Sequence, residues 1–351
     1  MNLKPFLKLM AEKNASDLFF TPMAPIKIKI EGKIMSLTKE PLTVEQVQSA
    51  AYGVMTEDQI AYLGRELEID FAISEPGMGR YRANVFHQRG NLAMVMRFVT
   101  LNVPRLTELN LPPILETLAM RKRGLVLMVG ATGSGKSTTL AALIDHRNEH
   151  STNHIITIEE PIEFLHHNKE SIINQRELGL DTKSYSRALK SAMREAPDVV
   201  LIGEIRDRET MQAAITLAGT GHLCIATLHA NNASETLDRI INMFPQNQHR
   251  QVFMDLAHYL EAIIAQRLVI GRNGRRLPAV EVLINTPHVA DLTKKGDVSS
   301  IKEALRESME EGMQSFDNAL YGLYKEGAIT LETALADADS ATDLEARVNF
   351  G

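Results

Sequence analysis

The hydrophobic positions of this chain are spaced differently in successive segments, and each spacing predicts an element. Residues 26–30 alternate isoleucine with lysine, the period of two that is typical of a half-buried strand. Residues 33–37 return after a Glu-Gly turn and complete a predicted hairpin. Helices are predicted to begin at Thr43 and Thr56, because each is followed three residues later by the glutamine of a capping box. Further strands are predicted at residues 69–74, 81–86 and 92–99.

The pattern changes at a proline-rich stretch and divides the chain into two predicted domains. Residues 1–103 predict a small α+β domain, and residues 104–113, with three prolines and little periodicity, predict a linker. From residue 114 to residue 351 strands and helices alternate, which predicts a mostly parallel sheet of the α/β class. Its candidate strands are residues 125–129, 154–158, 199–202 and 223–227. The last hundred residues are predicted to be mainly helical, with a hairpin around residues 272–275.

Composition and charge narrow the class of protein. The chain has 351 residues, of which 44% are hydrophobic and 23% charged, as in an ordinary globular protein. A net charge of −6 and an aromatic content of 5% disfavour a nucleic-acid motor, which usually presents a basic surface. The single cysteine, Cys224, excludes a disulfide framework and a four-cysteine zinc site within one chain, and we expect it to be a buried small hydrophobic residue.

The chain carries no pattern that targets it to a membrane. Charged residues interrupt the first twenty positions, unlike the apolar core of a signal peptide, and no run approaches 18 apolar residues. We therefore expect a cytoplasmic protein without direct membrane insertion.

Residues 130–137, Gly-Ala-Thr-Gly-Ser-Gly-Lys-Ser, have the spacing of a P-loop between a predicted strand and a predicted helix. Glycines let backbone N–H groups curve around phosphate oxygens, and the helix N-terminus adds positive potential. We expect Lys136 to reach the β- and γ-phosphates and the Ser137 hydroxyl to ligate Mg²⁺. The predicted nucleotide-binding residues are Gly130, Ala131, Thr132, Gly133, Ser134, Gly135, Lys136, Ser137 and Thr138.

Acidic residues follow two of the predicted strands, at the sheet edge where ligands gather in α/β folds. Glu159, Glu160 and Glu163 come directly after the strand at 154–158, and one of them could polarise the attacking water or hold Mg²⁺ through water. The alternative is a solvated acidic loop. Glu204 ends the strand at 199–202, where a carboxylate can hold the Mg²⁺ shell together with Ser137.

Histidines and arginines supply further candidate residues. His222 and His229 bracket the strand at 223–227 and could sense the γ-phosphate or link one active site to the next. Zinc is a poor alternative, because the spacing fits no zinc pattern and only one cysteine is present. His166 and His167 are expected to be a surface pair.

Arginines far from the P-loop in sequence are candidate arginine fingers, which neutralise charge on the γ-phosphoryl group. Arg80 and Arg82 share one strand face, and Arg97 lies on the next predicted strand. The alternative for each is a solvated strand position or a salt bridge. Separately, residues 185–193 predict a helix whose apolar stripe consists of Tyr185, Ala188, Leu189, Ala192 and Met193.

Taken together, four motifs in this order resemble those of the secretion ATPase superfamily, which serves type II secretion and type IV pili. They are GATGSGKS (130–137), ITIEEPIEF (156–164), PDVVLIGEIRD (197–207) and TGHLCIATLHANNA (220–233). Shorter similarities lie at residues 15–18 and 312–317, so the resemblance covers nearly the whole chain. It is greatest to the pilus retraction branch, PilT and PilU, because the assembly ATPases commonly carry a four-cysteine zinc insertion.

Within that branch the chain is more similar to the PilU type. Ala131 stands where PilT proteins typically have proline, and residues 289–292 read Val-Ala-Asp-Leu where PilT proteins have Ala-Ile-Arg-Asn. Residues 335–351 extend beyond the usual end of PilT. Glu160 replaces the usual aspartate, so Glu163 is the better match to the catalytic glutamate of the family.

The resemblance implies a PAS-like α+β N-terminal domain, a RecA-like P-loop ATPase domain with a mainly helical C-terminal end, and a homohexamer that uses ATP and Mg²⁺. It implies catalytic roles for Glu163, Glu204 and His229, with Arg82 or Arg97 as a contact from the neighbouring subunit. The implied function is type IV pilus retraction, as an accessory ATPase peripheral to the inner membrane. The implied partners are a PilT-type paralogous ATPase and the inner-membrane pilus platform protein, and no nucleic acid.

Two other functions remain open. One is a weakly hydrolysing, nucleotide-binding adaptor ring that docks on a PilT-type motor. The other is a RecA-like DNA-transfer ATPase or helicase, which predicts stimulation by single-stranded DNA and a basic channel that carries aromatic side chains. The absence of tryptophan and the negative net charge disfavour the second.

Overall fold

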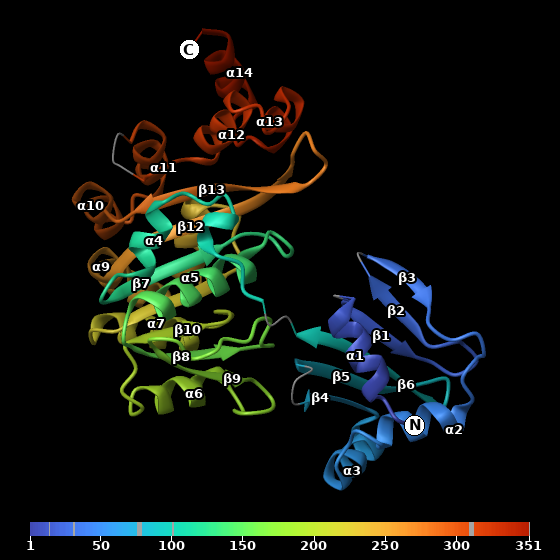
Figure 1. Cartoon of the computed structure of the whole chain (residues 1–351). Helices are drawn as coiled ribbons and strands as arrows, with labels where there is room; N and C mark the ends of the chain where they lie inside the picture. Colours follow the sequence, from blue (N-terminus) through green and yellow to red (C-terminus); the bar gives the residue numbers. More distant parts are fainter. Residues whose placement is uncertain (14, 31, 76–78, 100–101, 309–311, 351) are drawn as a thin grey trace. The chain divides into compact units, whose positions relative to one another are not determined.

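The computed structural model describes residues 1–13, 15–30, 32–75, 79–99, 102–308 and 312–350, and it divides into two compact units. Unit 1 comprises Met1–Asn102 with Glu163–Leu165, and unit 2 comprises Val103–Ile162 and His166–Gly351. Each unit has a buried apolar cluster of its own (Figure 1). Among the described residues, no helix combines the length and the apolar character that crossing a bilayer requires.

In the described part of unit 1, an antiparallel sheet is combined with three helices. Its elements are α1 (Lys4–Glu12), β1 (Asp17–Phe20), β2 (Lys27–Ile30), β3 (Lys33–Ser36), α2 (Val44–Tyr52), α3 (Glu57–Glu66), β4 (Glu68–Glu75), β5 (Gly79–Gln88) and β6 (Asn91–Val99). The strand order is β3-β2-β1-β6-β5-β4. Both predicted capping boxes are present, at Thr43 and Thr56. The predicted hairpin and the three further strands are confirmed.

Unit 2 is built on a seven-stranded sheet of order β13-β12-β7-β11-β10-β8-β9, in which every pairing is parallel except that of β12 with β13. Its strands are β7 (Gly124–Val129), β8 (His154–Glu159), β9 (Ile172–Glu177), β10 (Val199–Ile202), β11 (Leu223–Leu228), β12 (Leu260–Ile270) and β13 (Arg276–Ile284). The four predicted strands correspond to β7, β8, β10 and β11. The predicted hairpin is confirmed as β12–β13, and its parallel pairing with β7 was not predicted, nor was β9.

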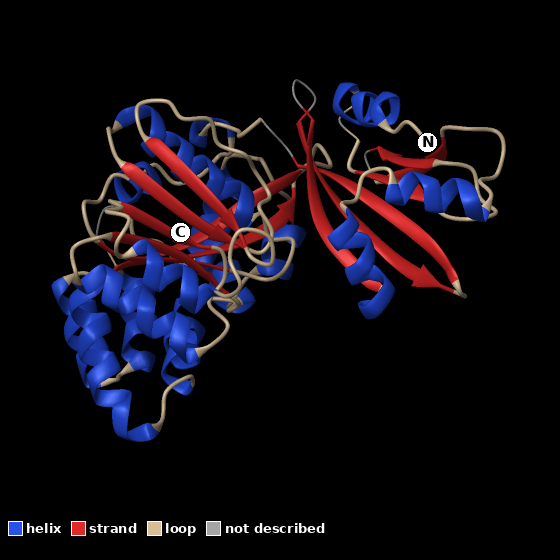
Figure 2. Ribbon diagram, turned by 90° about the horizontal axis from the view of Figure 1, so that it is seen from below, coloured by secondary structure: helices blue, strands red, loops and turns tan. Residues whose placement is uncertain are grey.

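Helices cover both faces of this sheet (Figure 2). They are α4 (Ile114–Ala119), α5 (Lys136–His150), α6 (Tyr185–Ala192), α7 (Arg208–Gly219), α8 (Ala233–Asn242), α9 (His249–Tyr259), α10 (Pro287–Lys295), α11 (Val298–Glu307), α12 (Phe316–Lys325), α13 (Leu331–Asp337) and α14 (Ala341–Phe350), with 3-10 turns η1 (Leu106–Glu108) and η2 (Gln246–Gln248). On β7, Leu125 and Leu127 join one core cluster, whereas Val126 and Met128 join the other. Because successive strand residues face opposite ways, a strand covered on both faces is apolar throughout.

Two local expectations were wrong, and one was confirmed. Met193 follows the end of α6 and is exposed, so the apolar stripe stops at Ala192. His166 is not a surface residue, because only 3% of its side chain is exposed and its Nδ1 lies 3.8 Å from an Asp145 carboxylate oxygen. A charged partner nearby makes burial of an imidazole tolerable. Cys224 is a buried free thiol, as predicted.

Candidate functional site

The P-loop lies between β7 and α5, and its glycines adopt conformations that other residues avoid. Gly130 and Gly135 have φ values of 146° and 87°. A Cβ on Gly130 would lie 2.4 Å from the backbone oxygen of Gln266, and one on Gly135 would lie 2.8 Å from the Gln266 side-chain nitrogen. Both positions therefore require glycine because of backbone conformation and because β12 packs closely against the loop.

Lys136 is the first residue of α5, and its side chain folds back over the loop. Its Nζ donates hydrogen bonds to the carbonyl oxygens of Gly130, at 2.7 Å, and Ala131, at 2.8 Å. Burial lowers the pKa of Lys136, and the charge of Glu204 opposes this effect. Ser134 Oγ is buried and has no hydrogen-bond partner among the described residues. The loop thus presents a cation and an unpaired hydroxyl, both of which suit a phosphate ligand.

A buried side chain from β12 connects the P-loop to α5. The Gln266 side-chain amide donates to the Ser134 carbonyl oxygen at 2.8 Å and accepts from the Thr139 hydroxyl at 2.8 Å. Gln266 is 2% exposed and Thr139 is 1% exposed, so these bonds lie away from water. Because unpaired buried polar groups are costly, this amide fixes the loop relative to α5.

Next to the P-loop, a charged cluster lies at the carboxyl ends of β8, β10 and β11. Glu204 accepts a hydrogen bond from Arg206 Nε at 2.5 Å through one oxygen, and its other oxygen lies 2.8 Å from His229 Nε2. Arg206 also pairs with Glu160 at 2.8 Å. The cluster therefore joins the residues that follow three neighbouring strands, as expected of the ligand edge of an α/β sheet.

Tyr185, the first residue of α6, lies beside this cluster. Its buried hydroxyl has no hydrogen-bond partner among the described residues, and a Cβ on Gly203 would approach it to 3.0 Å. Burial raises the pKa of Tyr185, and the charge of Glu160 adds to the effect. Sequence reasoning placed Tyr185 only in an apolar stripe, whereas its hydroxyl is a neutral donor near several carboxylates.

The remaining predicted site residues lie elsewhere. His222 precedes β11, at the opposite end of this strand from His229, and its Nδ1 lies 3.2 Å from the carbonyl oxygen of Leu217 in α7. It therefore does not share a site with His229 in this chain, and its role in linking sites stays a prediction. Glu163 belongs to unit 1 in the division above and is exposed, so its catalytic role also stays a prediction.

The two candidate arginine fingers are neighbours in unit 1. Arg82 on β5 is directly opposite Arg97 on β6. Arg97 Nε donates to the buried carboxylate of Asp17 at 2.8 Å, while 61% of the Arg97 side chain remains exposed. Asp17 thus orients Arg97 on the sheet surface, and the contact of either arginine with a nucleotide stays a prediction.

Two hollows in unit 2 meet at Gln266. One, of about 360 Å³, is lined by residues 130–134 of the P-loop with Asn231, Arg267 and Asp337. The other, of about 530 Å³, is lined by residues that include Gly135, Thr138 and the segment 108–111. Both exceed the lower limit of about 300 Å³ that is usual for small-molecule sites.

The residues present also fit a magnesium ion that arrives with a nucleotide. Among the described residues, no group of three or more His, Cys, Asp or Glu side chains could hold a metal by itself. Mg²⁺ in nucleotide sites usually keeps several waters and takes only one or two protein ligands in addition to phosphate oxygens. Ser137, on the first turn of α5, and Glu204 offer such a set.

Comparisons with known proteins agree with this geometry. A family model described as "Type II/IV secretion system protein" matches residues 2–275. The chain belongs to this family. It is 52% identical to the type IV pilus ATPase PilU of Pseudomonas aeruginosa, over 100% of this chain and 92% of that protein. It is 38% identical to the PilT retraction ATPase of the same organism, over 95% of this chain and 97% of that protein.

A solved structure supports the same assignment. The crystal structure of the pilus retraction motor PilT with bound ADP matches with a TM-score of 0.92 and 40% identity, over 98% of this chain and 99% of that chain. The resemblance to the pilus retraction branch of the secretion ATPases is therefore confirmed, and so is the predicted fold class.

Sequence reasoning missed three residues of the site: Arg206, Gln266 and Tyr185. Arg206 follows two residues after Glu204, so its position in that motif was a usable signal. Gln266 is a polar residue within the apolar strand 260–270, a pattern that usually marks a buried hydrogen bond. Nothing in the sequence pattern marked Tyr185 as a site residue, because a tyrosine in an apolar helical stripe is most often a core residue.

Proposed function

We propose that this secretion ATPase hydrolyses ATP to drive type IV pilus retraction, as a PilU-type accessory motor. The observation that carries the proposal is the arrangement around Glu204. Its carboxylate is held by Arg206 and His229 at the carboxyl ends of β10 and β11. Its charge also acts on the P-loop lysine, since burial lowers the pKa of Lys136 and the charge of Glu204 opposes that effect. The 52% identity to a PilU over the full chain supports the accessory role.

The chain's own residues would act as follows. The P-loop N–H groups and Lys136 bind the β- and γ-phosphates, and the N-terminus of α5 adds positive potential. A bound Mg²⁺ would neutralise charge on the phosphates, with Ser137 and Glu204 as the residues that hold it. Glu163 would accept a proton from the attacking water. His229 and Arg206 orient Glu204 through their hydrogen bonds.

We further propose a homohexameric ring. Heterologous contacts between identical subunits form a ring when they close. The next subunit can then complete the nucleotide site at each interface. Arg82 or Arg97 would supply the charge from the neighbouring subunit. Binding and release of nucleotide around the ring would open and close the interfaces and produce movement.

The proposed partners are a PilT-type ATPase and the pilus platform protein of the inner membrane. The proposed location is the cytoplasmic side of that membrane. The relative named PilT, which is 38% identical, is the kind of paralogue on which this ring would dock.

The experiment is an ATPase assay of the purified chain, alone and with a PilT-type partner, with Lys136→Ala as the matched variant. We expect Mg²⁺-dependent phosphate release that Lys136→Ala abolishes, because the variant lacks the ammonium group that contacts the phosphates. Equal turnover in the variant would refute the assignment of the P-loop. Turnover that is detected only with the partner, and that Lys136→Ala of this chain leaves unchanged, would identify an adaptor ring instead.

A further inference from the structure

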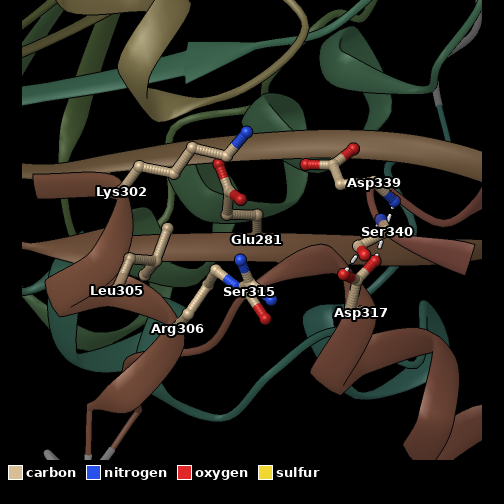
Figure 3. Close-up of a pocket in the computed structure, with 8 residues that line it drawn as sticks. All are labelled: Glu281, Lys302, Leu305, Arg306, Ser315, Asp317, Asp339 and Ser340. Atoms are coloured by element: carbon tan, nitrogen blue, oxygen red, sulfur yellow. Dashed lines mark hydrogen bonds between the residues drawn. The ribbon is translucent and has the colours of Figure 1, made fainter. Parts of the chain in front are cut away.

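The C-terminal segment, residues 337–350, is attached to the rest of unit 2 by polar contacts, by Leu344 and Ala338, and by Arg347, which lies over the Tyr321 ring at 4.4 Å. Leu344 is the buried residue of α14, at 1% exposure. Asp317, near the start of α12, accepts hydrogen bonds from the backbone N–H groups of Asp339 and Ser340, at 2.8 and 3.2 Å, as Figure 3 shows. Exposed ion pairs contribute little, so the attachment rests mainly on Leu344, at about 1.5–3 kcal/mol, and on the Arg347–Tyr321 contact, at about 0.5–1 kcal/mol.

Arg267 on β12 connects this segment to the P-loop hollow. One guanidinium nitrogen pairs with the Asp339 carboxylate at 2.6 Å, and another donates to the Asp337 carbonyl oxygen at 2.8 Å. The guanidinium also lies over the Phe316 ring, 3.9 Å from its centroid. Arg267 and Asp337 line the same hollow as P-loop residues 130–134. A cation that borders a phosphate site is therefore paired with a carboxylate of the C-terminal segment.

Strand β12 also links the C-terminal segment to the P-loop. Gln266, which holds the P-loop, directly precedes Arg267, and both line the P-loop hollow. Because β12 pairs with β7 immediately before the P-loop, at Ala265 and Val129, the strand cannot shift without moving the loop. β12 thus places Gln266 against the P-loop and Arg267 beside Asp337 and Asp339, at the edge of the P-loop hollow.

We propose that Arg267 belongs to the nucleotide site and that Asp339 competes with nucleotide phosphates for it, so that docking of residues 337–350 lowers nucleotide affinity. This inference rests on the proposed function of the P-loop. When the segment is docked, the Asp339 carboxylate neutralises Arg267. When it is released, Arg267 strengthens phosphate binding. By linkage, a bound nucleotide must weaken the docking of the segment by the same factor.

A matched pair of variants tests this mechanism. Asp339 and Asp343 both lie in the C-terminal segment, and each pairs with an arginine outside it. Asp339→Asn and Asp343→Asn each remove one of these carboxylates. Only the partner of Asp339 lines the P-loop hollow, since Asp343 pairs with Arg306. We expect Asp339→Asn to tighten binding of a slowly hydrolysed, fluorescent ATP analogue by about fivefold, at the lower end of ordinary coupling factors. Asp343→Asn should change it by less than about twofold, and Arg267→Gln should weaken it.

Hydrogen exchange supplies the reciprocal measurement. Addition of the analogue should increase amide exchange in α14 of the wild-type chain and leave that of Lys136→Ala unchanged. Equal affinities in Asp339→Asn, Asp343→Asn and the wild-type chain would overturn the inference, as would increased protection of α14 on nucleotide binding. Failure of the wild-type chain to bind the analogue would overturn the proposed function and this inference with it, whereas equal binding by all the variants would overturn the inference alone.

Discussion

Replacing the buried carboxylate of Glu281 with an amide should stabilise the protein, and more so as the pH rises. Glu281 lies on β13 and is 4% exposed. Burial raises the pKa of Glu281 to about 7 from 4.5, and the charge of Asp339 adds to the effect, whereas hydrogen bonds from Ala233 and Phe316 N–H groups and the charge of Arg267 oppose it. Lys302, Arg306 and Asp317 line the same pocket (Figure 3).

The sign and size follow from proton linkage. Between pH 4.5 and pH 7 the unfolded state loses the Glu281 proton while the folded state retains it, so the free energy of unfolding falls as the pH rises through this window. A pKa difference of about 2.5 corresponds to at most about 3.5 kcal/mol, at about 1.4 kcal/mol for each pKa unit. Below pH 4.5 both states are protonated, and the penalty is absent. A glutamine keeps the acceptor oxygen and cannot ionise.

The assay is urea denaturation of the wild-type chain and Glu281→Gln at several pH values from 4.5 to 8. We expect the difference in unfolding free energy to shift in favour of the variant by about 3 kcal/mol across this range. Asp291→Asn is the matched control, because Asp291 is an exposed carboxylate paired with Lys295. The difference in unfolding free energy between Asp291→Asn and the wild-type chain should not increase with pH over this range. A difference between Glu281→Gln and the wild-type chain that does not change with pH would refute the reasoning.

Three further predictions concern the nucleotide site. Glu163→Gln should retain ATP binding and slow hydrolysis by about 10² or more, since an amide cannot accept the proton of water; normal turnover in Glu163→Gln with loss in Glu160→Gln would reverse the assignment. Arg97→Ala should bind ATP yet hydrolyse it slowly, and mixing it with a P-loop lysine variant should restore some phosphate release if the arginine acts between subunits; no restoration at any mixing ratio would argue against this. Gln266→Leu should weaken ATP binding by about tenfold, because it leaves the Thr139 hydroxyl unpaired in the core, and unchanged affinity by fluorescence titration would contradict the role of Gln266.

The sequence predicted those parts of the fold that local patterns specify. Runs such as 125–129 and 199–202 are apolar throughout because both faces of the sheet are covered, and the P-loop spacing marks its own strand and helix. Strand β9, which reads Ile-Ile-Asn-Gln-Arg-Glu, has polar residues because it is the edge strand, so its pattern was not read as a strand. The site residues from β12 could not be placed, because their role depends on a pairing with β7 that is more than a hundred residues away in sequence.

The hydrogen bonds and ion pairs of the acidic residues indicate which carboxylate has an oxygen available to accept a proton from water. A general base needs an oxygen that is available to accept a proton. Glu204 has its oxygens paired with Arg206 and His229, and Glu160 is also paired with Arg206. Such pairing occupies carboxylate oxygens that would otherwise be available to water.

Glu159 is similarly engaged, since its carboxylate accepts from the Thr157 hydroxyl at 2.6 Å and from the Gln175 amide at 3.2 Å. Glu163 is exposed and has no hydrogen bond or ion pair among the residues that the structure describes. Of these carboxylates, Glu163 has oxygens that no described residue engages, which supports its proposed role as the base, while the fixed geometry of the paired Glu204 supports its proposed role in holding Mg²⁺. The hydrogen bonds support this proposed division of roles independently of the family resemblance, and the Glu163→Gln and Glu160→Gln variants therefore test both.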